Sequence, residues 1–282
     1  MALSILNNIS SLMAQNQLSI TGANLQQTLQ RLSSGSRINS GADDAAGLAI
    51  ADGLSANISA LTQSARNATD GVGQLQVADG ALSQVTALLN RAVTLATQGS
   101  TGTVSDAQRA ALDAEFTSIK TEIDAIGGKT TYNGQAVFGA AAALTVYMSD
   151  SSTAGTRSVT VTIGQVDATH LGTSGGSAVT INADDLTTAA KSQAALININ
   201  KAIGGIAALR GTLGASANQL QAASNVMRVQ IQNLSGAENG IRSADIGAEV
   251  ANLSKYSILQ QTGISALQQS SQMQQSVLKL LQ

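Results

Sequence analysis

A heptad pattern of apolar residues between Ala51 and Ala96 constrains the fold of this chain more than any other feature of its sequence. A repeat sustained over more than three heptads predicts a helix that packs in a coiled coil or a bundle. The expected helix has roughly 50 residues and a length of about 75 Å. The repeat consists of Ala51, Leu54, Ile58, Leu61, Ala65, Ala68, Val72, Leu75, Leu82, Val85, Leu89, Ala92 and Ala96.

The composition favours long helices and offers little material for a globular core. The 282 residues include no Pro, no Trp and no Cys, and aromatic residues make up 2%. An interior Pro costs a helix about 3 kcal/mol, so its absence is compatible with uninterrupted helices. Because aromatic bulk is missing, the core must come from narrow aliphatic seams between helices.

Charge and hydropathy exclude two classes of partner. The formal net charge is −2 and 11% of the residues are charged, so the chain has no basic footprint for nucleic acid. No continuous apolar run reaches the length of about 18 residues that a membrane span needs. The first residues lack the basic start and apolar core of a secretory signal. We therefore expect a cytoplasmic chain or one exported without a cleaved signal.

Both ends of the chain predict nearly uncharged amphipathic helices. Arg31 is the one charged residue among the first 36, and Lys279 is the one charged residue after Tyr256. An ordinary surface helix has a charged outer face, so Gln, Asn and Ser there indicate a packed, partly wet assembly. The expected self-assembly seams are Ile9, Met13, Ile20, Leu25, Leu29 and Leu32 at the N-terminus, and Ile246, Val250, Leu253, Ile264, Leu267, Leu278 and Leu281 at the C-terminus.

The middle of the chain predicts two more helices and a hairpin. One helix begins at Ser105 or Asp106 and ends at Gly127-Gly128, and another covers 186–234. Alternating residues at 144–148 and 158–163 predict a β-hairpin, and 164–186 is a Gly-, Ser- and Thr-rich loop with a short alternating run at 178–181. The expected fold is mainly α, an elongated coiled-coil or helix bundle with paired terminal helices and a small β-hairpin region.

No group of residues predicts an active site, a cofactor or a metal. His170 is the lone histidine, in a polar loop, and a surface position explains it better than a role as ligand or base. The pairs Asp43-Asp44 and Asp184-Asp185 each precede a predicted helix, where capping and the helix dipole favour carboxylates. The Gly-rich stretches lack the spacing of a phosphate-binding loop.

The terminal helices would leave apolar seams uncovered in an isolated chain. Polar residues within the seams, Asn16, Gln260 and Gln274, weaken a two-helix pairing while they fix its register. Such segments become ordered when neighbouring subunits cover them. Complementary surfaces that do not close on themselves produce a helical filament.

Several blocks of the sequence resemble the signatures of bacterial flagellins. At the N-terminal end these are the runs 29–39 (LQRLSSGSRIN), 42–50 (ADDAAGLAI), 67–71 (NATDG) and 132–134 (YNG). At the C-terminal end they are 241–245 (IRSAD), 249–254 (EVANLS), 258–261 (ILQQ) and 277–281 (VLKLL). The resemblance covers nearly the whole chain, in separated blocks that follow the family's order.

The resemblance implies a domain organisation. Residues 1–40 and 239–282 would form the inner coiled-coil domain of a filament, and 41–238 the next domain, with its hairpin at about 140–165. The loop 164–186 is too short for the large outer domains of many flagellins, so the chain resembles a minimal flagellin.

The resemblance also implies partners and a location. The chain would be exported by the flagellar type III system and form an extracellular homopolymer used for swimming. Hook-associated and cap proteins would contact it, and an export chaperone would bind its C-terminal helix. The positions matching contacts of a vertebrate innate immune receptor are Arg91, Leu95, Gln98 and Glu115. Receptor binding stays open, because Ala92-Val93-Thr94 lacks the charged residues of strongly recognised members.

Two alternatives to a filament subunit stay open at this point. A hook–filament junction protein uses the same export route but does not polymerise alone. A soluble coiled-coil adaptor or enzyme scaffold would not need uncharged ends or the signature blocks. The block 258–261 and the short middle of the chain favour the filament subunit.

Overall fold

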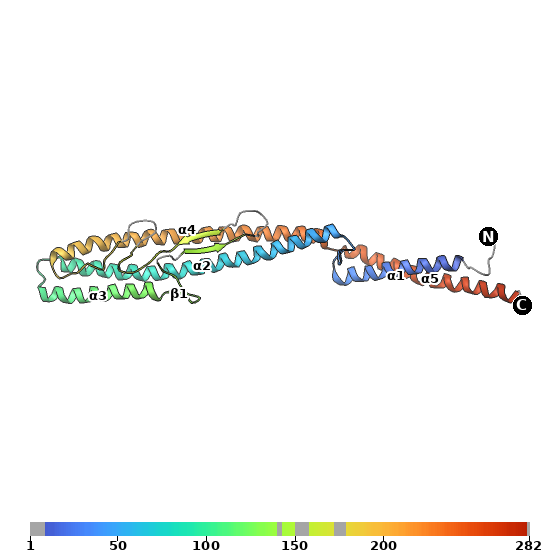
Figure 1. Ribbon diagram of the computed structural model, residues 1–282, viewed down its shortest axis with the longest axis horizontal. Coiled ribbons are helices and arrows are strands. Elements are labelled where there is room, and N and C mark those ends of the chain that lie inside the picture. The colour runs from blue at the N-terminus through green and yellow to red at the C-terminus, as the bar shows by residue number, and fades with distance from the viewer. Residues whose placement is uncertain (1–8, 140–142, 150–157, 172–178, 281–282) are drawn as a thin grey trace. The chain divides into compact units, whose positions relative to one another are not determined.

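The computed structural model describes residues 9–139, 143–149, 158–171 and 179–280. The described residues are mainly helical, which confirms the predicted fold class (Figure 1). The helices are α1 (Ile9–Ser34), α2 (Ala45–Gly99), α3 (Asp106–Lys129), α4 (Ala189–Arg242) and α5 (Ile246–Leu280). The strands are β1 (Thr131–Tyr132), β2 (Gln135–Ala136), β3 (Ala143–Tyr147) and β4 (Ser158–Thr162).

The chain divides into two compact units. The first contains residues 1–56 and 233–282, in which α1 packs on α5, and the second contains residues 57–232. The predicted domain boundaries near residues 40 and 239 stay predictions. No described helix has an apolar stretch long enough to cross a membrane.

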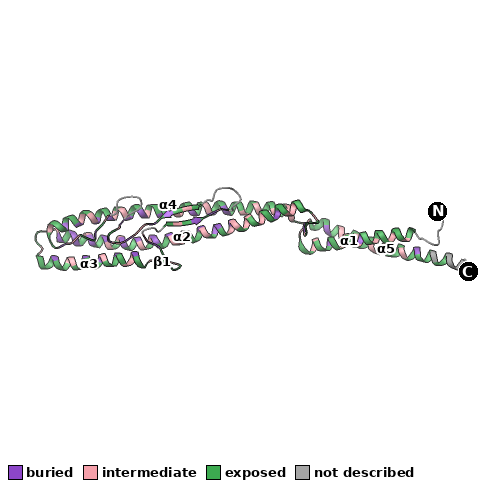
Figure 2. Ribbon diagram, in the orientation of Figure 1, coloured by how far each residue is buried: buried purple, intermediate pink, exposed green. Residues whose placement is uncertain are grey.

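The predicted heptad residues of α2 from Leu61 to Ala96, apart from the half-buried Val72, are buried in the core of unit 57–232 with residues of α3 and α4, which confirms this part of the predicted seam. Figure 2 shows buried residues recurring along the three helices. A bidentate pair between Arg210 and Asp79 connects α4 to α2, with an Nε–Oδ1 distance of 2.7 Å. The fully buried side chains include Leu75, Leu82 and Leu89 of α2, Phe116 and Ile123 of α3, and Ile199, Ile206 and Leu209 of α4.

The predicted hairpin is present as strands β3 and β4, which pair antiparallel with Val146 opposite Val159. Its expected turn at 150–155 lies outside the described residues. A Cβ on Gly71 of α2 would lie 2.7 Å from Cγ2 of Val146 and 3.2 Å from Cδ1 of Leu220. Gly71 therefore permits the close approach of both the hairpin and α4 to α2.

A second hairpin, β1–β2, was not predicted from the sequence. Its two-residue loop is Asn133-Gly134, with φ values of 50° and 76°. Two consecutive positive φ values define the turn type that Asn-Gly favours, so the Asn-Gly pair was the available signal. The Tyr132 hydroxyl lies 3.1 Å from the position of a Cβ on Gly73 of α2.

Side chains of α3 hold the segment 164–186 through its backbone. Asp124 accepts a hydrogen bond from the amide of Ala168 (2.7 Å), and Asp113 accepts one from the amide of Leu186 (2.8 Å). Lys120 donates to the carbonyl oxygens of residues 182 and 184. Val179 of the predicted alternating run pairs with Leu171, and residue 178 lies outside the described residues.

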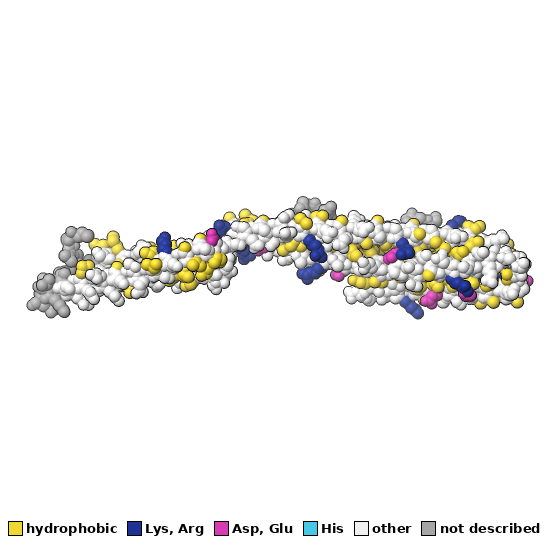
Figure 3. Space-filling model, turned by 180° about the vertical axis from the view of Figure 1, so that it is seen from behind, with side chains coloured by type: hydrophobic (Ala, Val, Ile, Leu, Met, Phe, Trp, Pro, Cys, Tyr) yellow, Lys and Arg dark blue, Asp and Glu magenta, His cyan; other side chains and the backbone are white. Residues whose placement is uncertain are grey.

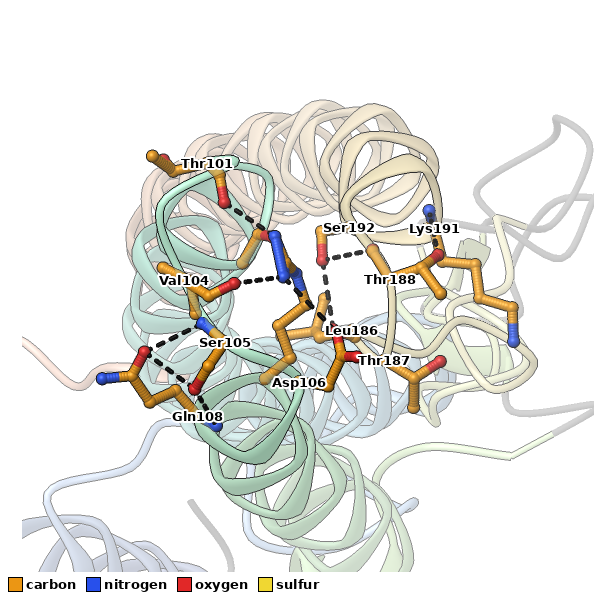
Figure 4. A network of polar contacts seen from close by, with 12 residues as sticks. Thr101, Val104, Ser105, Asp106, Gln108, Leu186, Thr187, Thr188, Lys191 and Ser192 are labelled. Atoms are coloured by element: carbon orange, nitrogen blue, oxygen red, sulfur yellow. Dashed lines mark hydrogen bonds and ion pairs between the residues drawn. The ribbon is translucent and has the colours of Figure 1, made fainter.

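Arg109 holds the corner between α2 and α3 by hydrogen bonds. This role of Arg109 was not predicted from the sequence. Its side chain is 7% exposed, and the guanidinium donates to the carbonyl oxygens of Gly99, Thr101 and Val104 (Figure 4). These acceptors belong to the end of α2 and the loop that follows, where no helical amide can reach them. Ser105 and Gln108 form a capping box that begins α3.

In the two aspartate pairs, one residue caps a helix and the others lie in the loops before the helices. Asp44 accepts a hydrogen bond from the amide of Gly47 (2.8 Å), so its predicted role as a cap of α2 is confirmed. Asp43 instead accepts bonds from the amides of Asn39 and Ser40 in the preceding loop. Asp184 and Asp185 also lie in the loop before their helix, where Asp185 binds Thr187 and Lys191.

Replacing Gly127 by Ala should destabilise the chain. The new Cβ would lie 1.6 Å from the carbonyl oxygen of Val166, so α3 or segment 164–186 must move. We expect a loss of about 1–3 kcal/mol, typical of overpacking. Gly128→Ala is the matched control, because nothing lies within 4 Å of its Cβ position and Ala favours a helix by up to about 1 kcal/mol. Thermal unfolding followed by circular dichroism measures both variants, and equal midpoints would contradict the prediction.

The ion pair at the start of α4 should give stability that is lost in acid. The hydrogen bond from Lys191 (2.7 Å), with those from Thr187, lowers the pKa of Asp185 from 3.8 to about 2. A folded-state pKa below the unfolded value stabilises the fold above pH 3.8, and this contribution disappears as pH falls to about 2. The pair is solvent-exposed, so the contribution is less than about 1 kcal/mol.

Lys191→Met should therefore reduce the dependence of the free energy of unfolding on pH in this window. Lys201→Met, at an exposed position further along α4, is the control and should keep the dependence of the unchanged chain. Denaturant titrations at a series of pH values give the comparison. Identical slopes for the two variants would show that the Asp185 pair does not contribute.

Candidate interaction surface on α1 and α5

Helices α1 and α5 pack against each other in antiparallel directions. Leu18 in the middle of α1 lies 3.2 Å, at Cδ1, from the position of a Cβ on Gly263. Near the end of α1, Arg31 lies 3.5 Å from Glu249, which is near the start of α5. The C-terminal end of α1 therefore lies beside the N-terminal end of α5.

The row of residues between the two helices, here called the contact row, follows heptad spacing, and its large apolar side chains are half-buried rather than buried. Every buried side chain that the structure describes in α1 and α5 is polar: Thr21, Thr28, Glu249 and Ser270. Half-buried residues complete the row: Ser11, Ala14, Leu18, Leu25 and Leu32 of α1, and Leu253, Tyr256, Gln260, Gly263 and Leu267 of α5. Such a row removes little apolar area from water.

Many of the large apolar side chains of α1 and α5 lie outside the contact row and are exposed. Met13 is 68% exposed and Ile20 is 52% exposed. Ile20 follows Leu18 by two residues, which is about 200° around a helix, so it faces away from α5. The exposed apolar residues are Ile9, Leu12, Met13, Ile20 and Leu29 of α1, and Ile246, Val250, Ile258, Leu259, Ile264 and Met273 of α5. Figure 3 shows hydrophobic side chains on the face of this helix pair that is turned to the viewer.

The structure divides the residues of the expected self-assembly seams between two surfaces. Leu25, Leu32, Leu253 and Leu267 lie in the contact row. Exposed members are Ile9, Met13, Ile20, Leu29, Ile246, Val250 and Ile264. Leu281 and the side chain of Leu278 lie outside the described residues. In α5 the contact row uses Gly263 where the expected seam has Ile264, because Gly allows a closer approach of the two helices.

A partly paired charge lies at the end of the contact row. Arg31 is 3.5 Å from Glu249 and 3.8 Å from Asp43. Glu249 is 8% exposed, and among the described residues neither its Oε2 nor the Nε of Arg31 has a hydrogen-bond partner. Hydrogen bonds from Gln27 and from the loop amides lower the pKa of Asp43. Burying a carboxylate with one oxygen unsatisfied is costly, so this end of the pair adds little stability. The contact of Glu249 with Arg31 was not predicted from the sequence.

The four positions that match an innate-receptor site do not form one surface. Arg91 and Glu115 form an exposed bidentate pair between α2 and α3, with distances of 2.7 and 3.1 Å. The hydrogen bond from Arg91 lowers the pKa of Glu115. Gln98 is exposed, whereas Leu95 is 1% exposed and belongs to the core.

The lone histidine lies in a loop, as predicted. His170 has a side chain that is 41% exposed, and its Nδ1 lies 3.0 Å from Asp167. Asp167 also accepts hydrogen bonds from the amides of Thr169 and His170, so the contact closes a turn. The described part of the chain contains no cluster of three or more side chains suited to a metal ion.

Comparison with known proteins assigns the chain to a family. The model of the bacterial flagellin N-terminal helical region matches residues 5–143, and that of the C-terminal helical region matches residues 196–281. Flagellin of Listeria monocytogenes is 34% identical over 291 residues, covering 97% of this chain and 98% of that protein. Flagellin of Bacillus subtilis is 32% identical over 304 residues, covering 98% of each chain.

A third relative shows how the length of this chain compares within the family. Flagellin of Escherichia coli is 38% identical over 190 residues, covering 67% of this chain but 37% of that protein. The 282 residues thus match nearly the full length of the first two relatives and a smaller part of the third. Family models at both ends and relatives of similar length show that the chain belongs to the bacterial flagellin family, as one of its short members.

Proposed function

We propose that this flagellin, a structural subunit of the flagellar filament, polymerises through the apolar side chains that α1 and α5 expose. One observation carries the proposal. The buried residues of the contact row are Thr, Ser and Glu and its Leu side chains are half-buried, while Ile, Met and further Leu side chains outside the row are exposed. A helix pair that was stable by itself would bury its large apolar side chains and expose its polar ones.

Burial by neighbouring subunits supplies the driving force. Covering a large aliphatic side chain completely contributes about 1.5–3 kcal/mol, so covering the exposed part of Met13 or Ile20 contributes about 1 kcal/mol or more. Several such residues on each helix add up to a stable contact between subunits. Few charges lie on α1 and α5, so repulsion between closely packed copies is small.

The positions of the exposed residues favour an open polymer over a closed dimer. Ile9, Met13 and Ile20 occupy the side of α1 that faces away from α5, whereas Val250 and Ile264 flank the contact row on α5. One neighbour cannot cover both surfaces, so each helix pair needs at least two. Contacts between unlike surfaces that do not close produce a helical filament.

Further partners follow from the family resemblance. An export chaperone would bind α5, and hook-associated and cap proteins would contact the ends of the filament. A structural role outside the cell requires no catalysis. Recognition by an innate receptor would depend on Arg91, Gln98 and Glu115, since Leu95 lies in the core.

Seeded growth separates the filament subunit from the hook–filament junction protein and the soluble adaptor. The purified full-length chain is mixed with short filament seeds or salted out, and products are imaged by electron microscopy. A filament subunit forms long filaments with no second protein. Short oligomers or persistent monomers under all conditions would contradict the proposal.

Replacing Ile9, Met13 and Ile20 together by Gln should abolish filament growth. Gln keeps helix propensity and removes the apolar surface that neighbours would bury. Because these side chains lie in the other unit, thermal unfolding of unit 57–232 should not change. Light scattering after seeding measures growth.

The control replaces three exposed polar residues of the same helix, Gln15, Ser19 and Gln26, by Ala. This variant should polymerise as the unchanged chain does. If both triple variants fail, the helix as a whole and not its apolar side is required. If both grow normally, the apolar side of α1 is not a subunit contact.

A further inference from the structure

The two Asn-Gly pairs of the sequence lie in opposite backbone environments. Asn133-Gly134 forms the loop of the β1–β2 hairpin, and Asn239-Gly240 lies inside the last turn of α4. An Asn-Gly pair is the dipeptide in which the backbone nitrogen reaches the side-chain amide most easily, because Gly has no Cβ to shield that nitrogen. The same reactive dipeptide thus occurs once in a loop and once in a helix.

The hairpin leaves the reacting atoms of the first pair accessible. Asn133 and Gly134 are exposed, and nothing lies within 4 Å of the Cβ position of Gly134. The strand pairing ends at Tyr132 opposite Gln135, so the amide of Gly134 lies outside the ladder. No hydrogen bond of the Asn133 side chain occurs in the described part of the chain. A hairpin of two-residue strands opens easily.

The helix protects the second pair. The carbonyl of Asn239 accepts a hydrogen bond from the amide of Ser243 (2.8 Å). Arg37 fastens the helix end, because its amide and guanidinium donate to the carbonyl oxygens of Arg242 and Ile241. The amide of Gly240 belongs to the helical hydrogen-bond pattern, so it can attack a side chain only after the helix opens locally.

We propose that Asn133 is a site of spontaneous deamidation with water as the co-reactant. The backbone nitrogen of Gly134 loses its proton and attacks Cγ of Asn133, so an N–Cγ bond forms. The Cγ–Nδ2 bond breaks, and ammonia leaves with the proton. Water then opens the succinimide ring at either carbonyl carbon, giving an aspartyl or an isoaspartyl residue at position 133. No oxidant or reductant takes part.

Either product changes the surface of the hairpin. Both add one negative charge, which takes the formal net charge from −2 to −3. The isoaspartyl product also adds a methylene to the main chain, so Tyr132 can no longer pair with Gln135 in the present register. Because Tyr132 packs over Gly73 of α2, the change reaches the surface of that helix.

Peptide mapping of the aged full-length chain tests the proposal. The folded chain is incubated at neutral and mildly alkaline pH, digested with trypsin and analysed by mass spectrometry. The tryptic peptides 130–157 and 229–242 report on Asn133 and Asn239 separately. A parallel incubation in concentrated urea removes the structure and provides the reference rates of both sites.

In the folded chain, Asn133 should deamidate at least about tenfold faster than Asn239, a difference of ~1.4 kcal/mol in activation free energy. In urea the two rates should be similar. The rate should rise with pH, and isoaspartate should appear with aspartate. Equal rates in the folded chain, no reaction at Asn133 while both sites react in urea, or aspartate without isoaspartate would each overturn the proposal.

Discussion

The polar contact row between α1 and α5 is the constraint from which the behaviour of the terminal helices follows. Thr21, Thr28 and Ser270 occupy positions where a self-sufficient helix pair carries Leu or Ile, so the pair gains little from burial. Unit 57–232 contrasts with it, because its core contains Leu82, Leu89 and Phe116. The chain thus joins a unit that is complete by itself to one that depends on contacts from outside.

Features whose signal lies in local periodicity could be predicted from the sequence. The heptads of α2, the alternating strands β3 and β4 and the cap at Asp44 all follow from the spacing of neighbouring residues. The apolar periodicity of α1 also followed from the sequence, but not which of its residues face α5, since the expected seam residue Leu29 is exposed. The family followed from the signature blocks.

Features that depend on packing between distant segments could not be predicted. Apolar periodicity in α5 favoured a row through Ile264, but it is Gly263 that lies between the helices, where Leu18 packs closely against it. Arg109 and Glu249 acquire their roles from groups that the sequence does not place nearby. Arg109 reaches carbonyl oxygens at the end of another helix, and Glu249 meets Arg31 from the opposite end of the chain.

Arg109 gives the corner between α2 and α3 a property that the ion pairs of the chain do not have. Its hydrogen-bond acceptors are the neutral carbonyl oxygens of Gly99, Thr101 and Val104, and guanidinium keeps its charge at every ordinary pH. The Asp185–Lys191 contact loses its attraction when the carboxylate is protonated, whereas the hydrogen bonds that Arg109 donates to these carbonyl oxygens need no ionised acceptor.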